Sequence, residues 1–365
     1  MGRLSKIHWV AYCALIFIIS RLIMLYQYDV ANIVLHNHHS DFFTTMCKWD
    51  CKWYVTIIQD GYDLHVRTYP KVWKGLANWA FFPLYPLLVK VIVLITRIPL
   101  LVVGIVLNQI FIFLSLLTFY RYLKLTQNEI NSRFGVLLLG FSPFSIYFAS
   151  LYTEASFLLL SLLSFYYLKT KRELLSVICG GLLSATRPVG FVFGVIFGIN
   201  RLRTNRLNAF SPKVILLGLI SVSGLILYML YLYIHTGDFL AFMHIQQGWG
   251  RKGLDPHHFT HQLTRMVDDS HNFVLFVLSV AISILLVWNK YFDEALFNLL
   301  CILPGVLTGQ MMSEGRFSGT LFTFYLGMVV VSQKSNSMKI LVAALFFLFY
   351  ITYFLYWIAK ASFLI

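Results

Sequence analysis

Long apolar runs, separated by short polar and basic segments, make up most of the 365-residue chain. About 20 apolar residues are needed for a helix to cross the hydrocarbon core of a membrane. The pattern therefore predicts an all-α, polytopic membrane protein with about 11 transmembrane helices. The expected spans are residues 7–25, 100–120, 134–149, 152–168, 176–185, 189–199, 214–234, 273–288, 295–311, 317–331 and 340–357.

The run at residues 81–98 is expected to lie in the interface or to re-enter the membrane rather than to cross it. Two prolines interrupt its start, and Lys90 lies in its middle. If this run does not cross, the basic clusters of the short loops all fall on one side, which the positive-inside rule makes cytoplasmic. Arg3 and Lys6 before the first span then place the N-terminus on that side.

The same topology predicts two large extracytoplasmic loops, at residues 27–80 and 235–272. The first loop is rich in His, Trp, Tyr and Asp, and its aromatic content argues against disorder. The sequence shows neither a clear internal repeat nor a low-complexity tract. We therefore expect one transmembrane domain over residues 1–365.

The segment MCKWDCKWYVTIIQDGY, residues 46–62, carries the strongest candidate for chemistry. If it is helical, Asp50, Trp53, Tyr54 and Ile57 share one face, so a carboxylate lies among aromatic and aliphatic side chains. Asp50 is the candidate catalytic residue. The alternative is an amphipathic helix on the membrane surface, in which the aromatic residues are interface anchors and Asp50 is solvated.

Composition agrees with the membrane assignment, because 59% of the residues are hydrophobic, only 12% are charged, and the mean hydropathy is +0.74. The net charge of +14 does not indicate a nucleic-acid partner, since the basic residues form small clusters between apolar runs. Of the five cysteines, only Cys47 and Cys51 flank the candidate aspartate. Their i, i+4 spacing is poorly suited to a disulfide within a helix, so we expect free thiols.

Further ionisable residues are predicted to emerge on the same side as Asp50. Glu154 lies at the outer end of a span and Arg187 between two half-length apolar segments, where a charge is costly and therefore a functional candidate. The alternatives are a headgroup-level position for Glu154 and a structural ion pair of Arg187 with Glu154 or Asp50. Arg316, in the motif SEGR, is either an anion contact or a plain loop charge.

The second loop contains a polar and aromatic set of the kind that binds sugars and phosphates. Its members are His244, Gln247, Trp249 and Arg251.

No cofactor is expected. Three histidines, at positions 257, 258 and 261, have the spacing of metal ligands in a helix. No carboxylate cluster accompanies them, so a site without metal is the prediction, and a bound divalent metal is the alternative. The sequence has no Gly-rich phosphate loop, GxSxG or HExxH motif. This excludes ATP-driven transport and the commonest hydrolases.

One important carboxylate near several cations suits the transfer of a sugar from a sugar phosphate to a hydroxyl. The phosphate leaves as an anion without protonation, so only a base is required. Asp50 would take the acceptor proton as the oxygen attacks the anomeric carbon, which inverts it. The membrane setting suggests a donor carried on a lipid. The candidate donor-binding and phosphate-binding residues are Arg187, Arg316, Arg251 and Glu154.

At these residues the sequence resembles the PIG-V family of integral-membrane mannosyltransferases, which belongs to the GT-C superfamily. The matching segments are KWDCKWYVTIIQDGY, NWAFFPLYPLL, FSPFSIYFASLYTEASFLLL, LLSATRPVGF and TGDFLAFMHIQQGWGR, within residues 46–251. The resemblance implies a GT-C fold, a polyprenyl- or dolichyl-phosphate mannose donor and a lumenal or periplasmic active site. Asp50 matches the family's base, and Glu154 matches the second acidic position of the superfamily.

The segment QQGWGR is more similar to the prokaryotic relatives, which implies a bacterial or archaeal cell membrane, with the endoplasmic reticulum as the site of a eukaryotic member. The acceptor would be a hydroxyl on a lipid or glycan. The aromatic residues Trp49, Trp53 and Tyr152 are expected to exclude water and to contact the substrate.

A competing interpretation is a lipid or lipid-linked-sugar transporter or flippase, which would also need a cationic groove. Such a protein would carry charges in the middle of its spans. Here the charges mostly stop at one face, which favours the enzyme.

Overall fold

The computed structural model describes residues 2–34, 41–69, 71, 74–204, 210–251, 270–308 and 313–361, and for residues 2–7 it describes the backbone alone. Every regular element within these ranges is a helix, which confirms the predicted all-α class.

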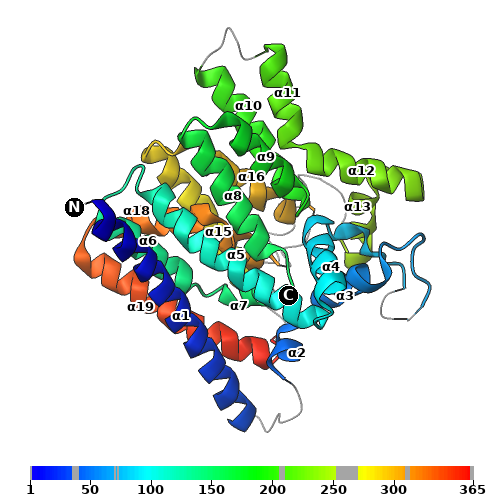
Figure 1. The fold of residues 1–365 in the computed structure, drawn as a ribbon, viewed down its shortest axis with the longest axis horizontal. Coiled ribbons are helices and arrows are strands. Elements are labelled where there is room, and N and C mark those ends of the chain that lie inside the picture. The colour runs from blue at the N-terminus through cyan, green and yellow to red at the C-terminus, as the bar shows by residue number, and fades with distance from the viewer. Residues whose placement is uncertain are drawn as a thin grey trace.

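The elements follow one another along the chain as a series of short and long helices (Figure 1). Those of the first half are α1 (Gly2–Val34), α2 (Phe42–Met46), α3 (Cys51–Asp60), η2 (Asn78–Ala80), α4 (Leu84–Thr96), α5 (Leu100–Leu123), α6 (Glu129–Gly140), α7 (Ser145–Ala149), α8 (Glu154–Lys169) and α9 (Glu173–Ser184). Those of the second half are η3 (Pro188–Phe191), α10 (Val192–Thr204), α11 (Pro212–Ser221), α12 (Ser223–Thr236), α13 (Ala241–His244), η5 (Ile245–Trp249), α15 (Ser270–Trp288), α16 (Phe292–Leu307), α17 (Glu314–Gly319), α18 (Phe322–Ser332) and α19 (Asn336–Ile358).

Four helices among the described residues are long and apolar enough to cross a membrane, namely α1 from His8 onward, α5, α15 and α19. The pair α11 and α12 passes the same test only when taken together. The other predicted spans are shorter helices, and those at 134–149 and 317–331 are each divided into two, α6 with α7 and α17 with α18. The count of about 11 crossings therefore stays a prediction.

The predicted span at residues 214–234 is not one continuous helix, because α11 and α12 meet at an angle of 63°. Contacts with α9 explain the bend. A Cβ atom at Gly224 would lie 2.3 Å from the carbonyl oxygen of Gly181, so only a glycine allows this approach. The backbone N–H of Leu225 then donates to the hydroxyl of Ser184. The start of α12 is thus drawn against α9 and away from the axis of α11.

Helix α8 lies at the centre of the bundle, where it packs between α5 and α9 (Figure 1). It is buried along almost its whole length, as expected of a helix that is apolar on all sides. Glu154 begins this helix and Lys169 ends it. The central helix thus carries one ionisable residue at each end.

The run at 81–98 forms α4, which has 13 residues. At 1.5 Å per residue it is about 20 Å long, so it is too short to cross a core of about 30 Å by itself. The hydroxyl of Tyr85 donates to the carbonyl of Gly104, and the N–H of Leu84 donates to the carbonyl of Ala185. These bonds hold α4 beside α5 and the end of α9.

The first predicted loop is folded rather than extended. Helix α1 continues to Val34, past its expected end at residue 25. Beyond α3, the carboxylate of Asp63 accepts from the backbone N–H of Asn78 and pairs with Arg67 at 2.8 Å. The indole N–H of Trp79 donates to the carbonyl of Asp63. This network packs the loop against α3.

Candidate active site

Asp50 directly precedes α3, which begins at Cys51, so the helix that the sequence suggested for residues 46–62 covers only part of that segment. The carbonyl of Asp50 accepts from the backbone N–H groups of Trp53 and Tyr54, so the aspartate still forms part of the first turn. Trp53, Tyr54 and Ile57 are buried, which confirms the predicted apolar face.

Cys47 and Cys51 form a disulfide with a Cα–Cα distance of 5.1 Å, so the expectation of free thiols is wrong. The expectation assumed that both residues belong to one helix. Instead, Cys47 follows α2 in a non-helical conformation, and Trp49 has a φ of 44°, in the left-handed region. This tight turn brings the two sulfur atoms together.

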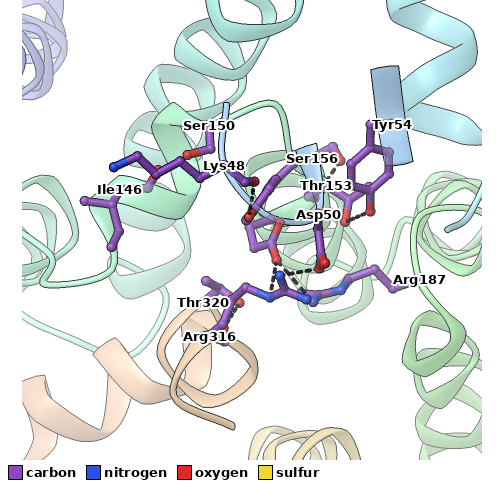
Figure 2. Close-up of polar contacts among 12 residues, drawn as sticks. Lys48, Asp50, Tyr54, Ile146, Ser150, Thr153, Ser156, Arg187, Arg316 and Thr320 are labelled. Atoms are coloured by element: carbon purple, nitrogen blue, oxygen red, sulfur yellow. Dashed lines mark hydrogen bonds and ion pairs between the residues drawn. The ribbon is translucent and has the colours of Figure 1, made fainter. Parts of the chain in front are cut away.

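Four ionisable residues from distant parts of the sequence form one chain of ion pairs (Figure 2). Arg316 Nη1 donates to Asp50 Oδ2 at 2.6 Å, and Arg316 Nε lies 3.1 Å from Glu154 Oε1. Arg187 Nη2 lies 3.1 Å from the same oxygen. The structure thus brings together the charges that the sequence predicted on one side. It also shows the structural ion pair that was the alternative for Arg187.

The two carboxylates of this ion-pair network differ in burial. The side chain of Glu154 is 2% exposed, whereas that of Asp50 is 24% exposed. Burial by itself lowers the pKa of Arg316, but the carboxylates of Asp50 and Glu154 outweigh it and raise the pKa above its ordinary value. A permanent positive charge therefore lies between an accessible carboxylate and a buried one.

Contacts with neighbouring elements fix the turn before α8. The side-chain amide of Asn108 on α5 donates to the carbonyls of Ser150 and Tyr152. The hydroxyls of Tyr54 and Thr153 are 3.3 Å apart. A carboxylate in the first helical turn is also favoured by the helix dipole. Glu154 is thereby held at the N-terminal end of the central helix.

A break between α9 and α10 presents Arg187. The residue is extended, with φ −156° and ψ 153°, and Pro188 follows it as the first residue of η3. Gly190 allows η3 to approach α9, because a Cβ atom there would lie 2.2 Å from the carbonyl oxygen of Leu183. Arg187 leaves the helical path at this break, as its position between two apolar segments suggested.

Three guanidinium groups lie over the ring of Phe317 on α17. Those of Arg187, Arg316 and Arg251 lie 4.9, 5.3 and 5.5 Å from its centroid. Burial, together with repulsion from Arg316, lowers the pKa of Arg251 to about 10, which still leaves it charged at neutral pH. The cluster is therefore rich in planar cationic donors that suit a phosphate group.

Glu314 lies on the same short helix as Arg316 and is fully buried. Burial raises the pKa of its carboxyl to about 8, so it is mainly neutral at pH 7. The two remaining carboxylates, Asp50 and Glu154, then face three arginines. The site carries an excess of positive charge, which favours an anionic ligand.

The predicted aromatic contacts divide into two groups. Tyr152 lies under Arg316, with its ring centroid 5.3 Å from the guanidinium carbon, and Trp53 packs edge-to-face on Trp249 at 5.5 Å. Tyr152 therefore borders the charged cluster, whereas Trp53 belongs to an aromatic group with Trp249 and Phe81. Trp49 instead packs on Trp357 of α19 at 4.7 Å.

The polar platform expected in the second loop is only partly formed. Arg251 joins the cluster through Phe317, as described above, whereas Trp249 packs on Trp53 and Phe81. His244 is exposed and pairs with Asp238 at 2.6 Å, and Gln247 is exposed on η5. Within the part of the chain that the structure describes, neither contacts the ion-paired residues.

Across the described residues, no group of three or more His, Cys, Asp or Glu side chains has the geometry of a metal site. The histidines at 257, 258 and 261 lie outside the described residues. Sequence reasoning assigned no role to Glu314, Phe317 or Lys48. The motifs SEGRF and KWDC contain them, but the patterns gave no reason to select them.

The model of the family described as Mannosyltransferase (PIG-V) matches residues 16–250, more than half of the chain. The match includes Asp50, Glu154 and Arg187 and stops one residue before Arg251; Arg316 lies beyond it. A search of curated proteins found no match.

Proposed function

Because the chain belongs to the mannosyltransferase (PIG-V) family, we propose that it moves mannose from a polyprenyl-phosphate donor to a hydroxyl of a lipid or glycan acceptor. The family establishes a glycosyltransferase, and the long apolar helices place it in a membrane. The donor, the acceptor and the roles of individual residues are our proposal.

The hydrogen bonding of the Asp50 carboxylate is the observation that supports this assignment. Arg316 binds Oδ2 and fixes the orientation of the group, and no described residue donates to Oδ1. An acceptor O–H would donate to Oδ1. As its oxygen forms a bond to the anomeric carbon, the proton moves to Asp50 and the bond from that carbon to the phosphate oxygen breaks on the opposite face. The sugar carbon is inverted.

The three guanidiniums around Phe317 suit the departing phosphate. They would stabilise the negative charge that develops as the sugar–phosphate bond breaks, so no second carboxyl group is needed as an acid. Glu154 is buried between Arg187 and Arg316 and would hold both in place. Trp53, Trp249 and Tyr152 would limit access of water to the reacting carbon.

We place this site on the extracytoplasmic face of a bacterial or archaeal cell membrane, or on the lumenal face of the endoplasmic reticulum in a eukaryote. The Cys47–Cys51 disulfide supports this face, because disulfides persist in oxidising compartments. Glu154 at one end of α8 and Lys169 at the other agree with the positive-inside rule. The proposal retains about 11 crossings in a GT-C arrangement.

Incubation of the purified protein with polyprenyl-phosphate mannose, glucose or arabinose tests the donor. We expect mannose to be transferred and Asp50→Asn to abolish transfer, because the amide cannot accept the proton. Asp60→Asn is the matched control, since Asp60 is exposed at the far end of α3 and should leave transfer unchanged. Normal turnover by Asp50→Asn in a folded protein would disprove the base assignment. Consumption of a nucleotide sugar alone would disprove the donor assignment.

A further inference from the structure

The disulfide closes a turn of five residues around the candidate base. It joins Cys47 to Cys51 at a sequence separation of 4, and Asp50 lies immediately before the second cysteine. Cys51 is fully buried, whereas Cys47 is partly exposed. A reductant in solution therefore has access from the side of Cys47.

The disulfide and a helix exclude each other in this segment. Residues i and i+4 of an α-helix have Cβ atoms about 5–6 Å apart, whereas a disulfide requires about 3.5–4.5 Å. The apolar spacing of residues 46–62 by itself favours one continuous helix. Trp49, at φ 44°, adopts a left-handed conformation that is unfavourable for a residue with a side chain. The covalent bond thus maintains a turn against the local preference of the sequence.

The turn formed by residues 47–51 also contacts α19. Lys48 Nζ donates to the carbonyls of Trp357 and Ile358 at the C-terminal end of α19, and Lys48 O accepts from the hydroxyl of Tyr152. These contacts and the packing of Trp49 on Trp357 require the turn conformation. Winding residues 47–50 into α3 would break them and rotate Asp50 relative to Arg316.

We propose that the Cys47–Cys51 disulfide positions Asp50 for transfer and makes the enzyme sensitive to reduction. Two electrons and two protons from a dithiol such as dithiothreitol convert the disulfide into two thiols, while the dithiol becomes a cyclic disulfide. The released segment extends α3 and moves the carboxylate away from Arg316. This inference rests on the proposed role of Asp50 as the base.

Thiol mapping and hydrogen exchange test the turn without any substrate. In protein alkylated without reduction, peptide mass spectrometry should find Cys47 and Cys51 linked. After reduction, amide exchange in residues 47–54 should change at least tenfold while exchange in α5 and α8 stays the same. Alkylation of both cysteines without reduction, or unchanged exchange after it, would overturn the proposal. These readouts hold even if the donor assignment fails.

Transfer assays then test the effect on the base. Reduction should lower kcat at least tenfold, because a displacement of about 1 Å costs up to a hundredfold in rate, and should change the KM for polyprenyl-phosphate mannose less than twofold. The acid limb of the kcat–pH profile, which reports the base, should disappear. Simple loss of folded enzyme would instead lower kcat evenly at every pH and would overturn the proposal. Reoxidation with oxidised glutathione should restore turnover.

Two variants separate this disulfide from the other thiols. Cys47→Ser/Cys51→Ser should have the low turnover of the reduced protein and no response to dithiothreitol. Replacement of the free cysteines Cys13, Cys179 and Cys301 by alanine should leave the full response. A double variant with normal kcat would disprove positioning. A response lost in the triple variant would assign the redox effect to other residues.

Discussion

Arg187 has a proposed role in binding the donor phosphate that is separate from the role of Asp50 as the base. Its guanidinium stacks on Phe317 and pairs with Glu154, so it joins the cationic group without contacting Asp50. We expect Arg187→Ala to raise the KM for the polyprenyl-phosphate donor about tenfold or more, while the KM for the acceptor changes little. Steady-state kinetics with each substrate varied in turn would measure this.

Arg201→Ala is the control for that substitution. Arg201 lies near the other end of α10 and pairs with Glu173, so the variant loses the same charge far from the cluster. An unchanged donor KM in Arg187→Ala would show that the residue is only a structural partner of Glu154.

The raised pKa of Glu314 should make the free energy of unfolding depend on pH. Its pKa of about 8 in the folded protein exceeds the ordinary value of 4.5, so between these values the folded state binds more protons than the unfolded state. The free energy of unfolding should therefore fall as the pH rises through this window, with a slope of up to about 1.4 kcal/mol per pH unit.

Glu314→Gln should remove this slope, because the amide does not ionise and can still accept from Ser318. Thermal unfolding in detergent from pH 5 to pH 8 would compare the two proteins. Equal pH dependence in both would refute the burial argument.

The side on which the residues at span ends lie was predictable, whereas of their contacts the sequence suggested only the ion pair of Arg187 with Glu154. The charge rule alone placed Asp50, Glu154, Arg187 and Arg316 on one side, and the structure joins them. The disulfide was missed because helical periodicity gives no sign of the left-handed residue Trp49 in the middle of the turn. Phe317 was missed because an aromatic residue in an apolar run has no distinguishing pattern.

At the scale of elements, the junction of α9 with η3 is the most constrained. A side chain at position 190 would collide with the backbone of Leu183 and Ser184. We expect Gly190→Ala to destabilise the protein by about 1–3 kcal/mol and to reduce transfer, because η3 must shift and Arg187 moves with it.

Gly198→Ala on α10 is the matched control, since a Cβ atom there meets nothing within 4 Å. Thermal unfolding and donor kinetics of both variants would measure the difference. A stable and fully active Gly190→Ala would mean that η3 can move without disturbing the site.

Element boundaries show where sequence patterns stop being informative. Hydropathy measures the length of an apolar run, and it correctly predicted α5 and α19. It could not detect the bend between α11 and α12, which arises from the approach of Gly224 to α9. Breaks of this kind depend on partners that are distant in the sequence.

For the whole molecule, the proposed topology predicts opposite accessibility for two exposed positions. Tyr69 lies in the first loop and Leu125 between α5 and α6. In a background in which Cys13, Cys179 and Cys301 are alanine, a membrane-impermeant maleimide added to intact cells should label Tyr69→Cys. It should label Leu125→Cys only after permeabilisation. The reverse pattern would place Asp50 in the cytoplasm.

The contact between the Asp50 turn and α19 also determines when the site is completed during synthesis. Lys48 and its acceptor carbonyl on Trp357 are 309 residues apart. A nascent chain can already contain the complete family-matched region and still lack the helix that supports this turn. Activity should therefore begin only after the ribosome has passed Ile358 and α19 has inserted beside α1. We expect a chain that stops before Trp357 to be synthesised and inserted into the membrane but to have no transferase activity.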